Sequence, residues 1–493
     1  MAHSIKFSGN LLLFILSLLL LTSCGTTEEV RTIEEGPRTP GDRTAEETDT
    51  DQLFQELTVG MIDPVDNLDP LFANNLSTMR ILSLIYDGLF TIDRDGEVVP
   101  AIADSVNISD DERVYTITLN NDLFFHDSSA FMSGIGRRLQ AADVKWAFER
   151  TARANVPTRA SELLKNIQGY EEYFEDQRNI YDTERRTRGE VTGIRVLDSR
   201  TIEFRLHEPD SDFLRKLASP YLFIYPREVI QRDGFSLKSN PVGTGAYTFI
   251  NRSENSIELS KDNSDRMADR LTQPNLNRIE FVYYPSESDL FQALAQNNID
   301  WIPEVGPETY YTAFTPEGDL EPGYQNEYVI SSGGERQVDL YLNQTRRVNI
   351  NWLHYRLSEI EVDTATTGRY LTINQPPPEV DSDQIGEPDD RYLVTFTSDL
   401  FARNLLSNIQ AQYLEPDSEF NLSDLRTPVS RSSIYTISTD SFHRQIVRPR
   451  PSWITYVTPV YGLHHQNIDG IINHQTPWKL FVEDIRVENG DQP

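Results

Sequence analysis

The fold class is indicated by residues 279–302, which read IEFVYYPSESDLFQALAQNNIDWI. Five of the first six residues are aromatic or β-branched, and Glu280 is the exception; such a run is typical of a strand. Ser286 and Asp289 are placed to begin a helix as a capping box, with Asp in the usual position of Glu, and that helix would run to about Asn297. The last four residues again favour a strand. The order strand, helix, strand predicts a βαβ unit.

Further strand and helix patterns lie on both sides of this unit. Val114–Leu119 and Thr201–Leu206 alternate between apolar and polar residues, as half-buried strands do. Ala141–Arg150 places its apolar residues at helical spacing. Leu393–Phe396 and Phe401–Tyr413 are predicted to be another strand and helix. Because strands and helices mix throughout, the predicted fold class is α/β.

The composition limits the classes of partner. The chain has 493 residues, and its 77 acidic and 45 basic side chains give a formal net charge of −32. Such a surface repels phosphates, so nucleic-acid binding is not expected. An acidic shell that maintains solubility is one interpretation of this charge, and attraction of cationic cargo is the other.

The N-terminus has the features of a secretory signal. A cationic start precedes an almost unbroken apolar run, Leu11–Leu21, which is about half the roughly 20 residues that a membrane-spanning helix needs. The following Thr-Ser-Cys24-Gly resembles a bacterial lipobox, in which the cysteine is lipidated. An ordinary signal peptide with a chance cysteine is the alternative. Residues 1–23 are therefore predicted to be a lipoprotein signal peptide, and Cys24 the lipidation site.

Residues 24–56 are predicted to be a disordered tether. Thr, Glu, Asp and Arg predominate in this stretch, which has too few apolar residues to offset the entropy of ordering. Cys24 is the only cysteine, so structural disulfides are excluded.

Several motifs across residues 57–302 resemble the motifs of one family and occur in the same order. The first block is Leu57-Thr-Val-Gly60, Asn67-Leu-Asp-Pro70, Ile85-Tyr-Asp-Gly-Leu-Phe90 and Pro100-Ala-Ile-Ala-Asp-Ser105. The second block is Tyr115-Thr-Ile-Thr-Leu119, Phe125-His-Asp127, Gly136-Arg137, Ala141-Ala-Asp-Val144 and Asn240-Pro-Val-Gly-Thr-Gly-Ala-Tyr247. By these motifs the chain resembles extracellular solute-binding proteins of family 5, the oligopeptide-, dipeptide- and nickel-binding lipoproteins of ABC transporters.

The resemblance implies a type II periplasmic-binding-protein fold, with two α/β lobes and a hinge that the chain crosses twice. The crossings are expected near residues 265–280 and 440–455. The expected division is lobe I at 57–270, lobe II at 271–445 and a return to lobe I at 446–493.

The second half departs from the family pattern. Asn349–Leu357 replaces a family helix, and the aromatic–acidic–proline segment is missing. In peptide-binding relatives that acidic residue pairs with the α-amino group of the ligand. A shortened, divergent C-terminal lobe is therefore expected, and ordinary peptide binding is in question.

The function implied by the resemblance is solute capture. A ligand binds in the cleft between the lobes, and lobe closure buries it. The predicted protein is a monomeric ABC-transporter lipoprotein that binds peptides or similar small solutes and docks on permease subunits. It would be lipid-anchored in the cell envelope, on the periplasmic or extracytoplasmic side, with no cofactor and no enzymatic activity. The alternative is a divergent envelope protein with a sensory or interaction role and no uptake function.

Six residues are candidates for ligand contact, and each also has a structural interpretation. Asn74, Asn75 and Ser77 follow a motif that borders the cleft in the family, and the alternative is a surface loop that caps a helix at 78–86. Tyr247, with Gly245 beside it, can contact a ligand or shape a turn. The last two are Trp453, which also suits a core, and Tyr461 in the family's closing segment.

The histidines do not predict a metal site. His464 and His465 are adjacent, so on a strand they point to opposite faces. His474 lies near them, but no His-Glu-x-x-His helix or cysteine ligand accompanies it. A structural or exposed role is expected for all three. His126 and Asp127 are expected to order a loop.

Overall fold

The computed structural model describes residues 55–180, 185–232, 236–264, 274–315, 318–342, 372–373, 394–396 and 454–488. Cys24, the predicted signal peptide, nearly all of the predicted tether, Trp453, Asn349–Leu357 and the predicted helix at Phe401–Tyr413 lie outside these residues. Within the described residues, no helix has the length and apolar character needed to cross a membrane.

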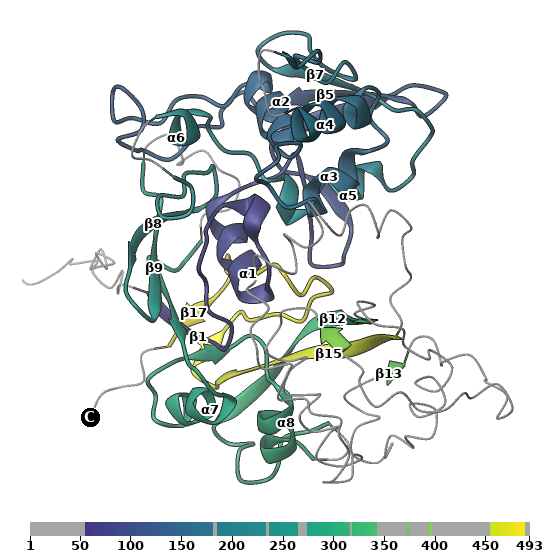
Figure 1. The fold of residues 1–493 in the computed structure, drawn as a ribbon. Helices are drawn as coiled ribbons and strands as arrows, with labels where there is room; N and C mark the ends of the chain where they lie inside the picture. The colour runs from purple at the N-terminus through teal and green to yellow at the C-terminus, as the bar shows by residue number, and fades with distance from the viewer. Residues whose placement is uncertain are drawn as a thin grey trace, which may run out of the picture. The chain divides into compact units, whose positions relative to one another are not determined.

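The largest sheet of the described residues is mixed, and Figure 1 labels several of its strands, among them β1, β8, β9, β12 and β15. Its strands follow the order β14-β12-β15-β11-β1-β10-β9-β8, and β13 pairs with β15. Strand β1 is parallel to both β10 and β11, whereas the other pairs are antiparallel. The strands are β1 (Glu56–Met61), β8 (Tyr247–Arg252), β9 (Ser256–Lys261), β10 (Arg278–Tyr283), β11 (Trp301–Ile302), β12 (Tyr328–Leu342), β13 (Thr372–Ile373), β14 (Val394–Phe396) and β15 (Ile454–His465).

The predicted βαβ unit is confirmed as β10, helix α7 (Glu287–Ala295) and β11. Ser286 is the N-cap, and its hydroxyl accepts a hydrogen bond from the Asp289 amide at 3.1 Å. The two strands of the unit are not neighbours, because β1 lies between them. A strand from the beginning of the described chain thus completes the parallel part of the sheet.

A four-stranded antiparallel sheet is formed by earlier segments, in the order β4-β5-β7-β6. The predicted strand at Val114–Leu119 is confirmed as β5, with Tyr115, Ile117 and Leu119 buried on one face. The other strands of this sheet are β4 (Ala103–Ile108), β6 (Ile194–Val196) and β7 (Thr201–Arg205). Two separate strand pairs are β2 (Phe90–Ile92) with β3 (Val98–Pro100) and β16 (Ile468–Asp469) with β17 (Arg486–Val487).

The helices of the described residues are short. The prediction at Ala141–Arg150 is confirmed as α2, which buries Val144, Ala147 and Phe148. The remaining helices are α1 (Leu76–Ile85), α3 (Arg159–Leu164), α4 (Tyr170–Asn179), α5 (Phe213–Leu217), α6 (Glu228–Gln231) and α8 (Pro307–Ala313), with 3-10 turns at Pro70–Phe72 and Pro220–Leu222.

Apolar side chains form two separate clusters on the two faces of the mixed sheet. Phe281 of β10 belongs to the larger cluster, which also holds the four-stranded sheet and α1. The next residue, Val282, packs against the smaller cluster around α7 and α8. Alternation along a strand sends neighbouring side chains to opposite faces, so one sheet supports both cores.

The turn at residues 240–247 is fixed by His126. The His126 amide donates to the Gly243 carbonyl at 2.9 Å, and the Nε2 atom of the ring lies 2.8 Å from the Gly245 carbonyl. Asp127 accepts a hydrogen bond from the Gly136 amide at 2.8 Å. The prediction that His126 and Asp127 order a loop is confirmed.

Candidate functional site

The parallel strands define a candidate site at their carboxyl ends. Strands β1, β10 and β11 end at Met61, Tyr283 and Ile302, at the same edge of the sheet. In α/β sheets, ligands bind in the crevice beyond the carboxyl ends of parallel strands. The residues that follow these strands are therefore candidates for contact with a ligand.

Helix α1 covers this edge with its N-terminal half. Asn75 caps the helix, since its side-chain oxygen accepts a hydrogen bond from the Thr78 amide at 2.7 Å. The Asn75 amide nitrogen donates to the Pro64 carbonyl at 3.1 Å. One side chain thus joins the helix to the segment after β1, and this contact places Ser77 and Arg80 at the sheet edge.

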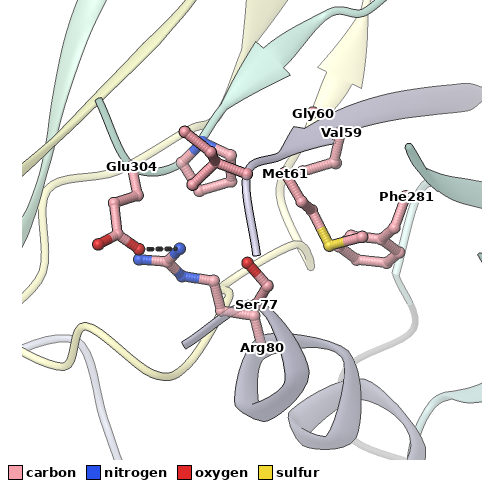
Figure 2. Close-up of a pocket in the computed structure, with 9 residues that line it drawn as sticks. Val59, Gly60, Met61, Ser77, Arg80, Phe281 and Glu304 are labelled. Carbon is pink, nitrogen blue, oxygen red and sulfur yellow. Dashed lines mark hydrogen bonds and ion pairs between the residues drawn. The ribbon is translucent and has the colours of Figure 1, made fainter. Parts of the chain in front are cut away.

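A small cavity lies between these elements (Figure 2). Its volume is ≈ 10 Å³, about the room that one water molecule needs. The lining is mainly apolar apart from Ser77, Arg80 and Glu304; it consists of Val59, Gly60, Met61, Ile62, Ser77, Arg80, Phe281, Pro303 and Glu304. The arrangement in this structure is therefore tightly packed, and a solute requires the elements to separate.

A buried ion pair closes one side of the cavity. In Figure 2, Arg80 extends from α1 toward Glu304, which follows β11; the Nη1 atom lies 2.9 Å from Glu304 Oε2. The two side chains are 6% and 11% exposed. Arg80 Nε also donates to the Pro477 carbonyl at 3.0 Å. Removing two charges from water is costly, so this pair depends on its full set of partners.

His474 is a neutral neighbour of this pair. Burial lowers its pKa to about 4, and the positive charge of Arg80 acts in the same direction. Its Nδ1 accepts a hydrogen bond from the Thr476 amide at 3.3 Å, and its ring packs 5.0 Å from Phe481. His474 therefore has a structural role, as predicted.

The other two histidines are structural as well. His464 Nδ1 lies 3.0 Å from the His465 carbonyl, and His465 Nε2 lies 3.0 Å from the Leu294 carbonyl. Across the described residues, no group of three His, Cys, Asp or Glu side chains is placed to hold a metal ion.

The structure brings only part of the predicted ligand set to this edge. Ser77 lines the cavity, Asn75 is the helix cap and Asn74 is partly buried beside it. Tyr247 is fully buried, and its hydroxyl donates to the Leu276 carbonyl at 3.1 Å. Burial raises the pKa of Tyr247, as does the charge of Glu483.

Gly245 and Tyr461 lie in packed surroundings. The Gly245 amide donates to the Ile85 carbonyl at 2.9 Å, so this glycine belongs to a tight turn. The Tyr461 ring stacks at 5.7 Å on Tyr310 and lies 5.8 Å from Phe314. Tyr461 is partly buried, so one edge of this aromatic cluster is accessible.

Arg80 and Glu304 were missed in the sequence analysis. Arg80 is the one charged residue in α1, LSTMRILSLI, and it is almost fully buried. Glu304 follows the βαβ unit after Pro303. A lone charged residue on an otherwise uncharged helix, and an acid shortly after a buried strand, were the available signals.

Comparison with known proteins gives sequence relatives over one part of the chain. A 184-residue stretch is 28% identical to the glutathione-binding protein GsiB of Pectobacterium atrosepticum, and it covers 37% of this chain and 30% of that relative. A 180-residue stretch is 31% identical to GsiB of Salmonella typhi, over 36% of this chain and 29% of the relative. The matched stretch thus spans less than a third of these relatives.

Solved structures match over a larger share of the chain. Listeria monocytogenes OppA bound to peptide has a TM-score of 0.60 at 14% identity, covering 88% of this chain and 99% of that chain. The dipeptide binding protein from Pseudoalteromonas sp. SM9913 in complex with Met-Leu also has a TM-score of 0.60 at 14% identity, covering 88% of this chain and 100% of that chain. These neighbours have the two-lobed periplasmic-binding-protein fold, which confirms the predicted α/β fold class.

The family model for bacterial extracellular solute-binding proteins, family 5 (middle region), matches residues 97–351. This range is just over half of the 493 residues. The chain therefore belongs to the bacterial extracellular solute-binding proteins of family 5.

Proposed function

We propose that this protein is the substrate-binding component of an ABC transporter and captures a peptide or a similar small solute between two lobes. The main support is the site at the carboxyl ends of β1, β10 and β11 in a chain of this family. The relatives named glutathione-binding proteins and the peptide-bound neighbour suggest solutes of peptide size.

The ion pair suggests how the lobes close. Arg80 lies in the proposed lobe I (57–270) and Glu304 in the proposed lobe II (271–445). Under this division the 2.9 Å contact joins the two lobes. Strand β1 stays hydrogen-bonded between β10 and β11, so the movement that opens the ≈ 10 Å³ cavity would be that of the segment around Glu304 away from α1. A solute that binds both lobes favours the closed state by its differential affinity for that state.

The N-terminus would hold the protein near its permease. Lipidation at Cys24 and a tether at 24–56 would restrict a monomeric protein to the membrane surface of the cell envelope, on the periplasmic or extracytoplasmic side. A linked binding module meets its partner at a raised effective concentration. The return of the chain to lobe I at 446–493 is part of the same proposal.

One observation favours the alternative, an envelope protein with a sensory or interaction role and no uptake. The ≈ 10 Å³ cavity has room for about one water molecule and is closed by a buried ion pair. A chain that no longer opens at this edge would retain the fold without capturing solutes.

A thermal-shift screen separates the two functions. The probes are di- and tripeptide pools, reduced glutathione and a nickel–histidine complex. A saturable rise in Tm with one class is expected, because a ligand specific to the native state stabilises it by mass action. The absence of a shift with every probe would contradict solute capture and favour the alternative.

A further inference from the structure

A second hollow lies beside the candidate site, and we name it the Arg252 groove. It has a volume of ≈ 450 Å³ and shares Met61 with the small cavity. Its lining includes Asp66, Lys238, Arg252, Ser253 and Tyr283. This volume lies within the roughly 300–1,000 Å³ range of small-molecule sites.

A β-bulge puts the Arg252 side chain on the inner face of the sheet. Phe249 pairs with Leu259 and Arg252 pairs with Ile257, but Ile250 has no partner in the register. Two residues three apart on a regular strand point to opposite faces. Because of the extra residue, Arg252 points to the same face as Phe249 and as the buried Ile257. Bulges are known to re-aim side chains in this way near binding sites.

Within the described part of the chain, only one of the three guanidinium nitrogens of Arg252 has a hydrogen-bond partner in this position. Its Nη1 makes a long contact of 3.5 Å with the Asp66 carbonyl. Its Nε and Nη2 are buried and have no hydrogen-bond acceptor among the described residues. Burial lowers the pKa of Arg252, and the nearby charge of Asp66 offsets part of this effect. A buried charged donor without an acceptor is unfavourable, so a missing partner is the simplest explanation.

The two Arg252 nitrogens that have no acceptor in the part of the chain that the structure describes are arranged to bind a carboxylate. Nε and Nη2 lie on the same edge of the guanidinium and donate in parallel, which matches the two oxygens of a carboxylate. Lys238 lines the same groove, is exposed and adds a second positive charge. The carboxylates of Asp66 and Glu254 are exposed at the same groove, so the groove carries both signs of charge.

The neighbouring turn is rigid before any ligand arrives. The Ser253 hydroxyl accepts hydrogen bonds from the Asn255 and Ser256 amides at 3.3 and 2.9 Å. The Asn255 carbonyl accepts from the Tyr283 amide at 2.7 Å. The turn therefore adds little ordering cost on binding, whereas the Arg252 side chain has to reorient.

We infer that the Arg252 groove binds a carboxylate group of a small organic acid through the paired Nε and Nη2 donors of Arg252, with Lys238 as a supporting charge. The Arg252 side chain gives up its long contact with the Asp66 carbonyl and turns its paired donors into the groove. This site is separate from the proposed solute capture at the edge of α1 and can exist without it.

The test is a titration of the full chain with sodium succinate, followed by thermal shift, at ionic strength matched with sodium chloride. A saturable rise in Tm with succinate, and none with chloride, is expected. Arg252→Lys keeps the charge but removes the parallel donors, so the apparent affinity should fall about tenfold or more. Arg195→Lys is the control, because Arg195 already contacts Glu203 at 3.2 Å; it should leave the affinity unchanged.

Several results would overturn the inference. They are the absence of a succinate effect in the wild type, an unchanged affinity in Arg252→Lys, or tighter binding of inorganic phosphate than of succinate. If circular dichroism shows that Arg252→Lys does not fold, the Lys238→Met variant is used to test the site instead, since the Lys238 side chain is exposed. A clear loss of succinate affinity in Lys238→Met supports the site, and an unchanged affinity contradicts it.

Discussion

Among single residues, Arg80 and Glu304 form one of the buried ion pairs of the described residues, and loss of this pair should lower stability. Glu304→Gln removes the partner of a cation that is almost fully buried. We expect this change to lower the free energy of unfolding by about 3 kcal/mol. Urea denaturation measures the change.

A double variant and an exposed pair serve as controls for this prediction. Arg80→Met with Glu304→Met should recover most of the loss, because no uncompensated charge remains. Asp484→Asn breaks an exposed pair with Arg94 and should cost less than about 1 kcal/mol. If Glu304→Gln and Asp484→Asn lowered the free energy of unfolding equally, burial of the Arg80–Glu304 pair would add nothing to its contribution.

His474 predicts a dependence of stability on pH. Its pKa falls from 6.5 to about 4 on folding. Below pH 6.5 the unfolded chain therefore takes up a proton that the folded chain does not, so stability declines as the pH falls from 6.5 to about 4 and levels off below that. The loss attributable to His474 is about 3 kcal/mol.

This contribution is measured by comparing the unfolding free energies of the wild type and His474→Asn at several pH values. The asparagine oxygen can keep the acceptor for the Thr476 amide while removing the titration. His207→Asn, at an exposed histidine, is the matched control. Parallel pH profiles for the wild type and His474→Asn would contradict the prediction.

Sequence reasoning found residues at this site when the pattern was local. Asn75 precedes a helix, so its capping role was among the interpretations of the sequence. Arg80 and Glu304 are 224 positions apart, and only the folded chain shows that they form a pair. The hydrogen bond from the Tyr247 hydroxyl to the Leu276 carbonyl joins residues 29 positions apart, and it is likewise not visible in a sequence.

At the level of elements, the succession of strands and helices along the chain could be predicted from the sequence. The pairing of strands within the sheet could not. The βαβ unit at residues 279–302 carries its own apolar pattern and cap, and the structure has the same elements. The insertion of β1 between β10 and β11 depends on a strand more than 200 residues earlier. The bulge at Ile250 likewise depends on the pairing partner, β9.

The turn at residues 240–247 gives a prediction for an element. A Cβ atom on Gly243 would lie 2.0 Å from the Ile85 carbonyl oxygen. Gly243→Ala should therefore destabilise the protein by roughly 1–3 kcal/mol, because backbone would have to move. Gly189→Ala is the matched control, since nothing lies within 4 Å of its Cβ position. Equal Tm values for the two variants would contradict the close packing of this turn.

For the whole molecule, the family could be predicted because its motifs follow one another in order over residues 57–302. The family model confirms it over residues 97–351. The lobe boundaries at 270 and 445, the shortened second lobe and the lipid at Cys24 stay predictions. The segments that decide them fall largely outside the described residues.

A solute that binds between the two lobes should hold them closed. Small-angle X-ray scattering on the protein with increasing amounts of the solute that stabilises it measures this closure. We expect the radius of gyration to fall and to saturate at the same concentration as the rise in Tm. A constant radius of gyration while Tm rises to saturation would contradict capture by lobe closure.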